Sequence, residues 1–77
     1  MYLTLTVRTK DGNETDIQVN EDQIIDSALK MLVQHGDIDG DAASGNFVKT
    51  YLRNKLVSRY HTFKETDILN GDIVTVI

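Results

Sequence analysis

The chain has 77 residues, of which 40% are hydrophobic and 26% charged, and its formal net charge is −4. This length allows a single domain, residues 1–77, because a second hydrophobic core could not be built from what remains. The sequence has no cysteine, which excludes disulfides, thiolate nucleophiles and cysteine-based zinc sites, and a net acidic chain is a poor general nucleic-acid binder. No apolar run approaches the roughly 20 residues that cross a bilayer, so we expect a cytoplasmic protein without membrane insertion.

The first twenty residues predict a β-hairpin. Residues 2–8 alternate between outward and apolar inward positions, as Tyr-Leu-Thr-Leu-Thr-Val-Arg, and residues 15–19 alternate again, as Thr-Asp-Ile-Gln-Val. Between them lies Lys-Asp-Gly-Asn, residues 10–13, where Asp-Gly favours a tight turn because both residues tolerate positive φ.

An amphipathic helix of about four turns is predicted next. Asn20 suits the N-cap position, and Gln23 follows at the spacing of a capping box. His35 and Gly36 mark the expected end of the helix. The stripe that we expect to face the sheet consists of Ile25, Ala28, Leu29, Leu32 and Val33.

The second half predicts a loop and three more strands. Residues 37–46 lack periodicity and form the loop, residues 47–52 form a strand with Val48 and Thr50 turned inward, and a turn at 53–55 leads to a short strand at 56–57. Phe63 and Ile68 are the expected core residues of a long connection. A tight turn at 70–72 then begins the last strand, residues 73–77, with inward valines at 74 and 76.

These elements predict an α+β fold in which a mixed four- to five-stranded sheet packs on one helix. A helix that crosses one face of such a sheet buries both apolar faces at once. The first and last strands have apolar inward faces, which suggests that they lie side by side in the middle of the sheet. That arrangement is a β-grasp.

No cofactor, metal or catalytic site is expected. The run Asp-Ile-Asp-Gly-Asp at 37–41 is rich in carboxylates, but Ala42 and Val48 occupy the positions where a calcium-binding EF-hand loop needs Gly and Glu, so we interpret the run as a solvated loop. His35 and His61 lack a partner nucleophile nearby, and no glycine-rich phosphate loop is present. We therefore expect a protein that is not an enzyme.

Charge is divided unevenly along the chain. Residues 11–41 carry nine acids and one base, whereas residues 47–64 carry five bases and no acid. Two interpretations of this basic block stay open: a solvated edge of the domain or a surface for a protein partner. Its members are Lys49, Arg53, Lys55, Arg59 and Lys64. An unpaired edge strand would also allow weak self-association.

The outward face of the sheet is the other candidate for protein binding. Tyrosine and arginine are favoured anchors of protein interfaces, although the exposed face of an antiparallel sheet is polar in any case. Both interpretations stay open. By alternation this face carries Tyr2, Thr4, Thr6, Arg8, Lys49, Tyr51, Thr75 and Ile77.

Over essentially its full length the chain resembles ubiquitin-like β-grasp proteins, and most closely the small bacterial YukD/EsaB family. The resemblance lies in the opening hairpin, the single helix and, in the second half, the segments Val48-Lys49, Arg53-Asn54-Lys55-Leu56-Val57 and Asn70-Gly71-Asp72 with Phe63 and Ile68 between them. It implies a cytoplasmic accessory or regulatory component of the type VII secretion system of Gram-positive bacteria, which binds the membrane-embedded machinery or its regulators without catalysis.

Two alternatives remain. A covalent modifier or sulfur carrier of the ubiquitin and ThiS kind would end in a slim Gly-Gly tail, whereas this sequence ends Val-Thr-Val-Ile inside the predicted last strand, which disfavours conjugation. The other alternative is a structural subunit of an unrelated assembly that shares the fold, since a fold does not determine a function.

Overall fold

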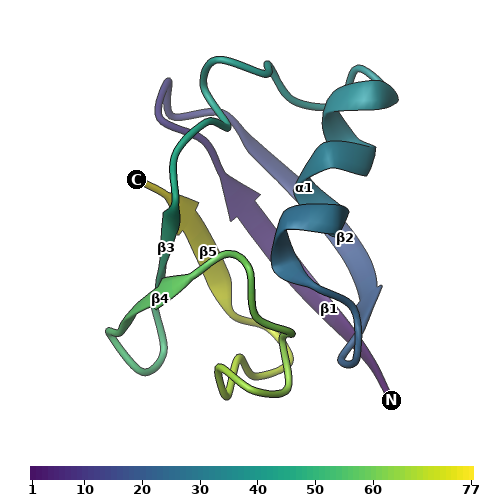
Figure 1. Ribbon diagram of the computed structural model, residues 1–77, viewed down its shortest axis with the longest axis vertical. Coiled ribbons are helices and arrows are strands. Elements are labelled where there is room, and N and C mark those ends of the chain that lie inside the picture. The colour runs from purple at the N-terminus through teal and green to yellow at the C-terminus, as the bar shows by residue number, and fades with distance from the viewer.

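The protein, described here by a computed structural model of residues 1–77, consists of one helix packed across one face of a five-stranded sheet (Figure 1). The order of the strands is β2-β1-β5-β3-β4, and only the pair β1–β5 is parallel. The predicted β-grasp arrangement is confirmed, including the central position of the first and last strands. The elements are β1 (Tyr2–Arg8), β2 (Glu14–Asn20), α1 (Ile25–Gln34), β3 (Phe47–Thr50), β4 (Leu56–Ser58) and β5 (Ile73–Val76).

The hairpin forms as predicted. β1 and β2 pair antiparallel with Leu5 opposite Ile17. The tight turn places Gly12 at a φ of +85°, a conformation that glycine adopts without strain. The inward side chains of β1 are all buried, so this face carries the core beneath α1.

The helix begins later than predicted and is shorter. Asn20 is the last residue of β2, and its side-chain oxygen accepts a hydrogen bond from Asp22 N (3.0 Å) in a turn that precedes the helix. The N-cap residue is Ile24, which has no side-chain capping bond. The prediction of Asn20 as the N-cap is therefore wrong, and α1 has ten residues instead of about four turns.

The reason for the late start is pairing between distant segments. Ile25 N donates to His61 O (3.0 Å) and Asp26 N donates to Arg59 O (2.7 Å), so main-chain carbonyls satisfy the first helical N–H groups. Ile24 also forms an isolated bridge with Thr62. These pairings hold Ile24 in an extended conformation and prevent the helix from starting before Ile25.

The core lies between α1 and the inner face of the sheet. Ile25, Ala28 and Leu29 are buried and Leu32 is half-buried, as the predicted stripe requires. Val33 differs: it is 36% exposed, and its Cγ1 faces Gly40 in the following loop instead of the sheet. The helix ends at His35 as the C-cap, with Gly36 at a φ of +78°.

The loop at 37–46 contributes to the core, which the sequence did not predict. Ile38 and Ala43 belong to the main hydrophobic cluster, and Ala42 is buried as well. Asp39 Oδ2 accepts a hydrogen bond from Ala42 N (3.0 Å), which turns the chain so that the two alanines point inward. No group of three or more histidine, cysteine or acidic side chains gathers in a position to hold a metal ion.

The second half agrees with the predicted pattern of inward residues. Val48, Thr50, Phe63, Ile68, Val74 and Val76 are all buried. β3 ends at Thr50, two residues earlier than predicted. Tyr51 N still donates to Ile73 O (3.0 Å), but Ile73 N donates to Asp72 Oδ1 (2.8 Å) and does not return the bond. Tyr51 N and Leu52 N also donate to Asp72 Oδ1 (3.0 Å each), which turns the chain away from β5. None of the helical structure has the length and apolar character that a membrane crossing requires.

Candidate protein-binding surface

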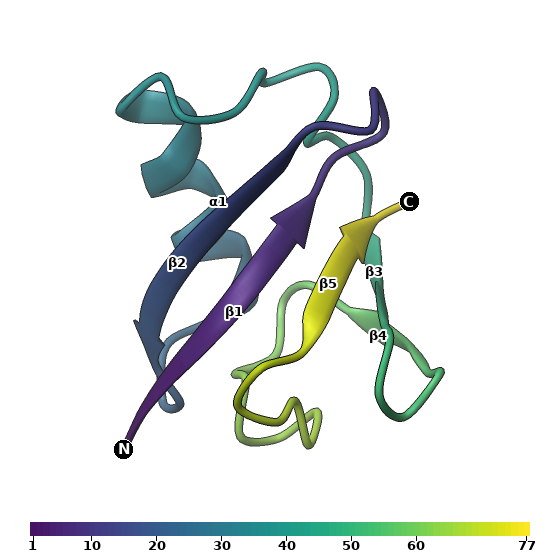
Figure 2. The same cartoon turned by 180° about the vertical axis from the view of Figure 1, so that it is seen from behind.

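The outer face of the sheet, opposite α1, brings together residues from three neighbouring strands. Arg8 of β1 lies beside Thr75 of β5, and Thr75 lies beside Lys49 of β3. Because adjacent strands are about 4.8 Å apart, these three residues form a row about 10 Å long across the sheet. Figure 2 shows this face, with β1, β5 and β3 side by side and α1 behind.

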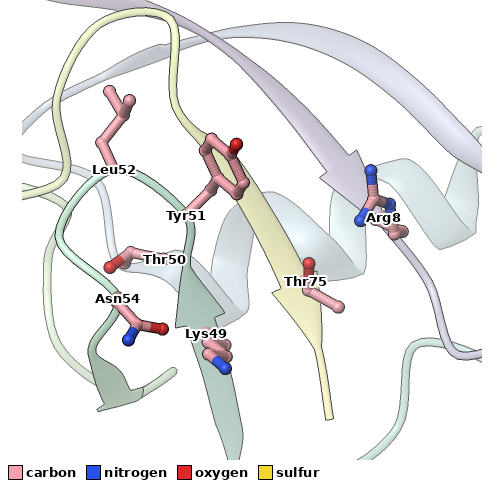
Figure 3. A pocket seen from close by; sticks show the side chains of 7 residues that line it. All are labelled: Arg8, Lys49, Thr50, Tyr51, Leu52, Asn54 and Thr75. Carbon is pink, nitrogen blue, oxygen red and sulfur yellow. The ribbon is translucent and has the colours of Figure 1, made fainter.

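An open hollow of about 570 Å³ lies along this row, where β3 ends (Figure 3). Tyr51 stands beside it with 69% of its surface exposed, and Leu52 is 52% exposed. We call Arg8, Lys49, Tyr51, Leu52 and Thr75 the Tyr51 face. The full lining of the hollow is Arg8, Lys49, Thr50, Tyr51, Leu52, Asn54 and Thr75.

Asp72 fixes the position of Tyr51 and Leu52. Its carboxylate is fully buried, and Oδ1 accepts hydrogen bonds from three backbone N–H groups: Tyr51 (3.0 Å), Leu52 (3.0 Å) and Ile73 (2.8 Å). The other oxygen, Oδ2, is buried without a partner. The backbone that carries the exposed aromatic ring is therefore held rigidly, which lowers the entropy lost when a partner packs on it. The sequence identified Asp72 only as a turn residue.

The uncompensated positive charge of the Tyr51 face comes from Lys49. Arg8 is paired with Glu14 across the hairpin, with Arg8 Nε donating to Glu14 Oε2 (2.7 Å), so its charge is largely compensated. Lys49, Arg53 and Lys55 have no carboxylate within 4.0 Å. All three bases are exposed, but only Lys49 lines the hollow beside Tyr51, whereas Lys55 lines a separate one with Val57 and His61.

Arg59 does not belong to this surface, although the sequence predicted it there. It is only 5% exposed, and its Nε donates to Asp26 Oδ1 (2.9 Å). Its Nη1 donates to the carbonyls of Ala43 (2.6 Å) and Gly45 (3.1 Å). The inclusion of Arg59 in an exposed basic block is therefore wrong, because the guanidinium cross-links α1 to the loop at 37–46.

Asp26 is the anion of this internal pair. Burial of its carboxyl group opposes ionisation, but hydrogen bonds and charge from Lys30 and Arg59 outweigh that effect and lower the pKa of Asp26 below its ordinary value. Lys30 Nζ lies 2.9 Å from Asp26 Oδ2 on the exposed side of the helix. The carboxylate stays ionised and keeps Arg59 in place.

The remaining predicted residues lie at the two ends of the outer face. Tyr2 and Thr4 are exposed at the start of β1, and Tyr2 pairs with Asn20 of β2. Arg8 lies six positions after Tyr2, which is about 20 Å along a strand, so Tyr2 is not part of the Tyr51 face. Thr6 donates to Asp16 Oδ1 (2.7 Å) and is half-buried.

At the other end the outer face is more apolar than predicted. Ile77 follows β5 and is 50% exposed, and its N–H donates to Phe47 O (3.3 Å). Phe47 is 47% exposed, and Leu56, opposite Lys49 in the β3–β4 pair, is 61% exposed. Sequence alternation could have found both residues, since inward Val48 and Val57 place Phe47 and Leu56 outward.

Solved structures with a ubiquitin-like fold are similar to this chain. A protein designed on the basis of ubiquitin matches with a TM-score of 0.69 at 17% identity, over 96% of this chain and 84% of that chain. The ubiquitin-like domain of Plasmodium falciparum Dsk2 matches with a TM-score of 0.59 at 13% identity, over 97% of each chain. A chain in the pParkin-pUb-UbcH7 complex matches at 0.63 and 17% identity, over 99% of this chain and 22% of that chain. The chain therefore has the ubiquitin-like β-grasp fold. No family model and no curated protein sequence matches it.

Proposed function

We propose that this chain is a ubiquitin-like interaction module, a single domain that acts by binding a protein partner noncovalently and not by catalysis. The observation that carries the proposal is the exposed Tyr51 ring beside the unpaired Lys49, on backbone that Asp72 holds in place. Tyrosine anchors and complementary charge are typical of protein recognition sites. Lys49 carries an uncompensated positive charge on this face, so the expected partner segment is acidic.

We further propose that the module works in the cytoplasm as an accessory or regulatory component of a type VII secretion system of Gram-positive bacteria. Support for this role comes from the spacing of residues 48–72, which resembles that of the YukD/EsaB family. The partner would then be a component or regulator of the membrane-embedded secretion complex.

Affinity capture of the tagged chain from its native bacterium tests both parts. We expect components of the secretion membrane complex to be retained under native washing and lost under denaturing washing. Partners that survive denaturation would instead indicate a covalent carrier. Retention of an unrelated assembly would contradict the secretion role but would still support a noncovalent binding module.

Matched charge reversals test the surface. Lys49→Glu changes the Tyr51 face, whereas Lys64→Glu makes the same change in charge at an exposed position outside it. We expect Lys49→Glu, and more strongly its combination with Tyr51→Ala, to weaken capture at moderate salt while Lys64→Glu has no effect. Equal weakening by both reversals would mean that net charge, and not this face, governs binding. Arg59 is left unchanged in these variants because it supports the fold.

A further inference from the structure

β2 is an unpaired edge of the sheet. It is hydrogen-bonded to β1 on one side and is the first strand in the order β2-β1-β5-β3-β4. Glu21 N donates to Met1 O (3.0 Å) just beyond the strand, which shows that odd-numbered residues direct their backbone groups to β1. By antiparallel alternation, the N–H and C=O groups of Asp16 and Gln18 point away from the sheet. These groups can pair with another strand.

A shallow apolar hollow of about 120 Å³ lies beside this edge, between β2 and α1. Met31 of α1 is 49% exposed there, and Ile17 and Leu32 are only half-buried. The hollow therefore exposes apolar side chains next to unpaired backbone groups. Its lining is Ile17, Gln18, Val19, Gln23, Ala28, Met31, Leu32 and His35.

The charge around the edge is negative. The stretch from β2 to the following turn, residues 14–22, contains four acids and no lysine or arginine. Thr15 Oγ1 donates to Asp37 O (3.4 Å), which brings the backbone of a further acidic residue to the start of the strand. Arg8 compensates Glu14, but Asp16 and Asp22 have no basic partner.

We propose that the β2 edge receives an extended segment of another protein, in which aliphatic residues alternate with lysine or arginine, as an additional strand of the sheet. The alternation follows from β2 itself. On the inner face an added strand would lie beside Ile17 and Val19 and the hollow under Met31, which favours aliphatic side chains. On the outer face it would lie beside Asp16, which favours a base.

The same charge argument disfavours a second copy of this chain. Antiparallel pairing of two β2 strands would place carboxylates of both copies together, and β4, the other edge, has only three residues. Lys49, Tyr51 and Leu52 of the Tyr51 face are on or just after β3, which two strands separate from β2, and only Arg8, already paired with Glu14, lies next to β2. The proposal therefore does not depend on the proposed function, and the module could hold two partners at once.

The first test uses the unmodified chain and the capped heptapeptide Lys-Val-Lys-Ile-Lys-Val-Lys. We expect amide hydrogen exchange at Asp16 and Gln18 to slow by about tenfold when the peptide is bound, because these N–H groups gain acceptors. A peptide N-methylated on alternate residues that face β2 should lose binding, while one methylated on the other residues should keep it. Equal binding of both methylated peptides, or protection confined to β4 or the Tyr51 face, would overturn the proposal.

Two further comparisons test the role of the hollow beside Met31 and the role of the negative charge along β2. Met31→Ser should weaken peptide binding by about tenfold, while Val33→Ser, the matched change on the other side of α1, should leave it unchanged. The peptide with glutamate in place of lysine should bind at least about tenfold more weakly at low salt. Equal binding of the acidic peptide would contradict the charge argument. Protection of Asp16 and Gln18 that rises with the concentration of the chain alone would identify a second copy as the occupant and overturn the proposal.

Discussion

Arg59 Nε donates to Asp26 Oδ1 at 2.9 Å, and this pair joins the first turn of α1 to the segment that follows β4. Asp26 N also donates to Arg59 O (2.7 Å), so the two residues are connected through both side chain and backbone. The guanidinium additionally donates to two carbonyls of the loop at 37–46. One side chain thus connects three segments that are far apart in the sequence.

Removal of the Arg59 side-chain charge should destabilise the fold strongly. Arg59→Met leaves Asp26 Oδ1 and two loop carbonyls without their donor, and breaking a buried pair in this way lowers the free energy of unfolding by about 3 kcal/mol. Urea unfolding at neutral pH measures the loss. The control is Lys30→Met, which removes the exposed partner of Asp26 and should lower the free energy of unfolding by about 0.5 kcal/mol or less. Similar losses in the two variants would contradict the central role of Arg59.

The Asp26–Arg59 pair should also make the free energy of unfolding depend on pH in the acidic range. The folded-state pKa of Asp26 lies below its ordinary value of 3.8, because the hydrogen bonds and charges of Lys30 and Arg59 outweigh burial. The ionised carboxylate therefore stabilises the fold above the unfolded-state pKa, and this contribution is lost as pH falls through the folded-state pKa. The urea concentration at the unfolding midpoint should decrease for the wild type once the pH is below about 4, and it should decrease less steeply for Asp26→Asn. Parallel curves for the two proteins would show that Asp26 contributes nothing to acid sensitivity.

Substitution of Asp72 should loosen the Tyr51 face as well as destabilise the domain. Asp72→Ala removes the acceptor of three backbone N–H groups and should lower the free energy of unfolding by about 2–3 kcal/mol. Faster amide hydrogen exchange at Tyr51 and Leu52 than at β1 residues would locate the effect. Asp72→Asn retains one acceptor oxygen, so it should fall between the wild type and Asp72→Ala. An alanine variant with unchanged exchange at Tyr51 would exclude the anchoring role.

Two glycines with positive φ should respond differently to alanine. Gly12 has a φ of +85° with open space around it, so Gly12→Ala should cost only the backbone strain of about 1 kcal/mol. Gly45 has a φ of +126°, and an added Cβ would lie 2.6 Å from Ile77 O. Gly45→Ala should therefore lower the thermal midpoint distinctly more than Gly12→Ala. Equal midpoints would mean that the backbone at residue 77 moves away freely.

Local periodicity was sufficient to predict most of the fold. The alternation in β1 and the Asp-Gly turn fixed the hairpin, and the inward positions of Val48 and Val74 followed from the same rule. These signals are reliable because the side-chain period of a strand determines which face is buried. The central position of β1 and β5 was predicted as well, because the apolar inward faces of both strands indicate that each lies between two neighbouring strands.

The errors arose where distant segments interact. Asn20 and Gln23 have the spacing of a capping box, but the backbone of residues 59–62 occupies the start of the helix instead. A reciprocal box does form at Thr62 and Glu65, with Thr62 N donating to Glu65 Oε1 (2.9 Å) and Glu65 N to Thr62 Oγ1 (3.0 Å). Sequence spacing alone could not distinguish the two sites.

The candidate site was predicted only in part for a similar reason. Charge counting placed Arg59 with the exposed bases, because its partner Asp26 is 33 residues away in the sequence. Alternation placed Arg8, Lys49 and Thr75 on the same outer face, whereas their alignment in one row required the register seen in the structure. The anchoring of Tyr51 by Asp72 required the structure, since it depends on where β3 ends.

The position of β5 has a consequence for how the protein is made. β5 lies between β1 and β3, although residues 73–76 leave the ribosome after the other four strands of the sheet. Until they emerge, β1 and β3 have no common neighbour, and the apolar inner face remains divided into two halves. Assembly of the sheet must therefore wait until residues 73–76 have emerged, and any pause in translation before residue 73 prolongs the exposure of both halves to chaperones and proteases.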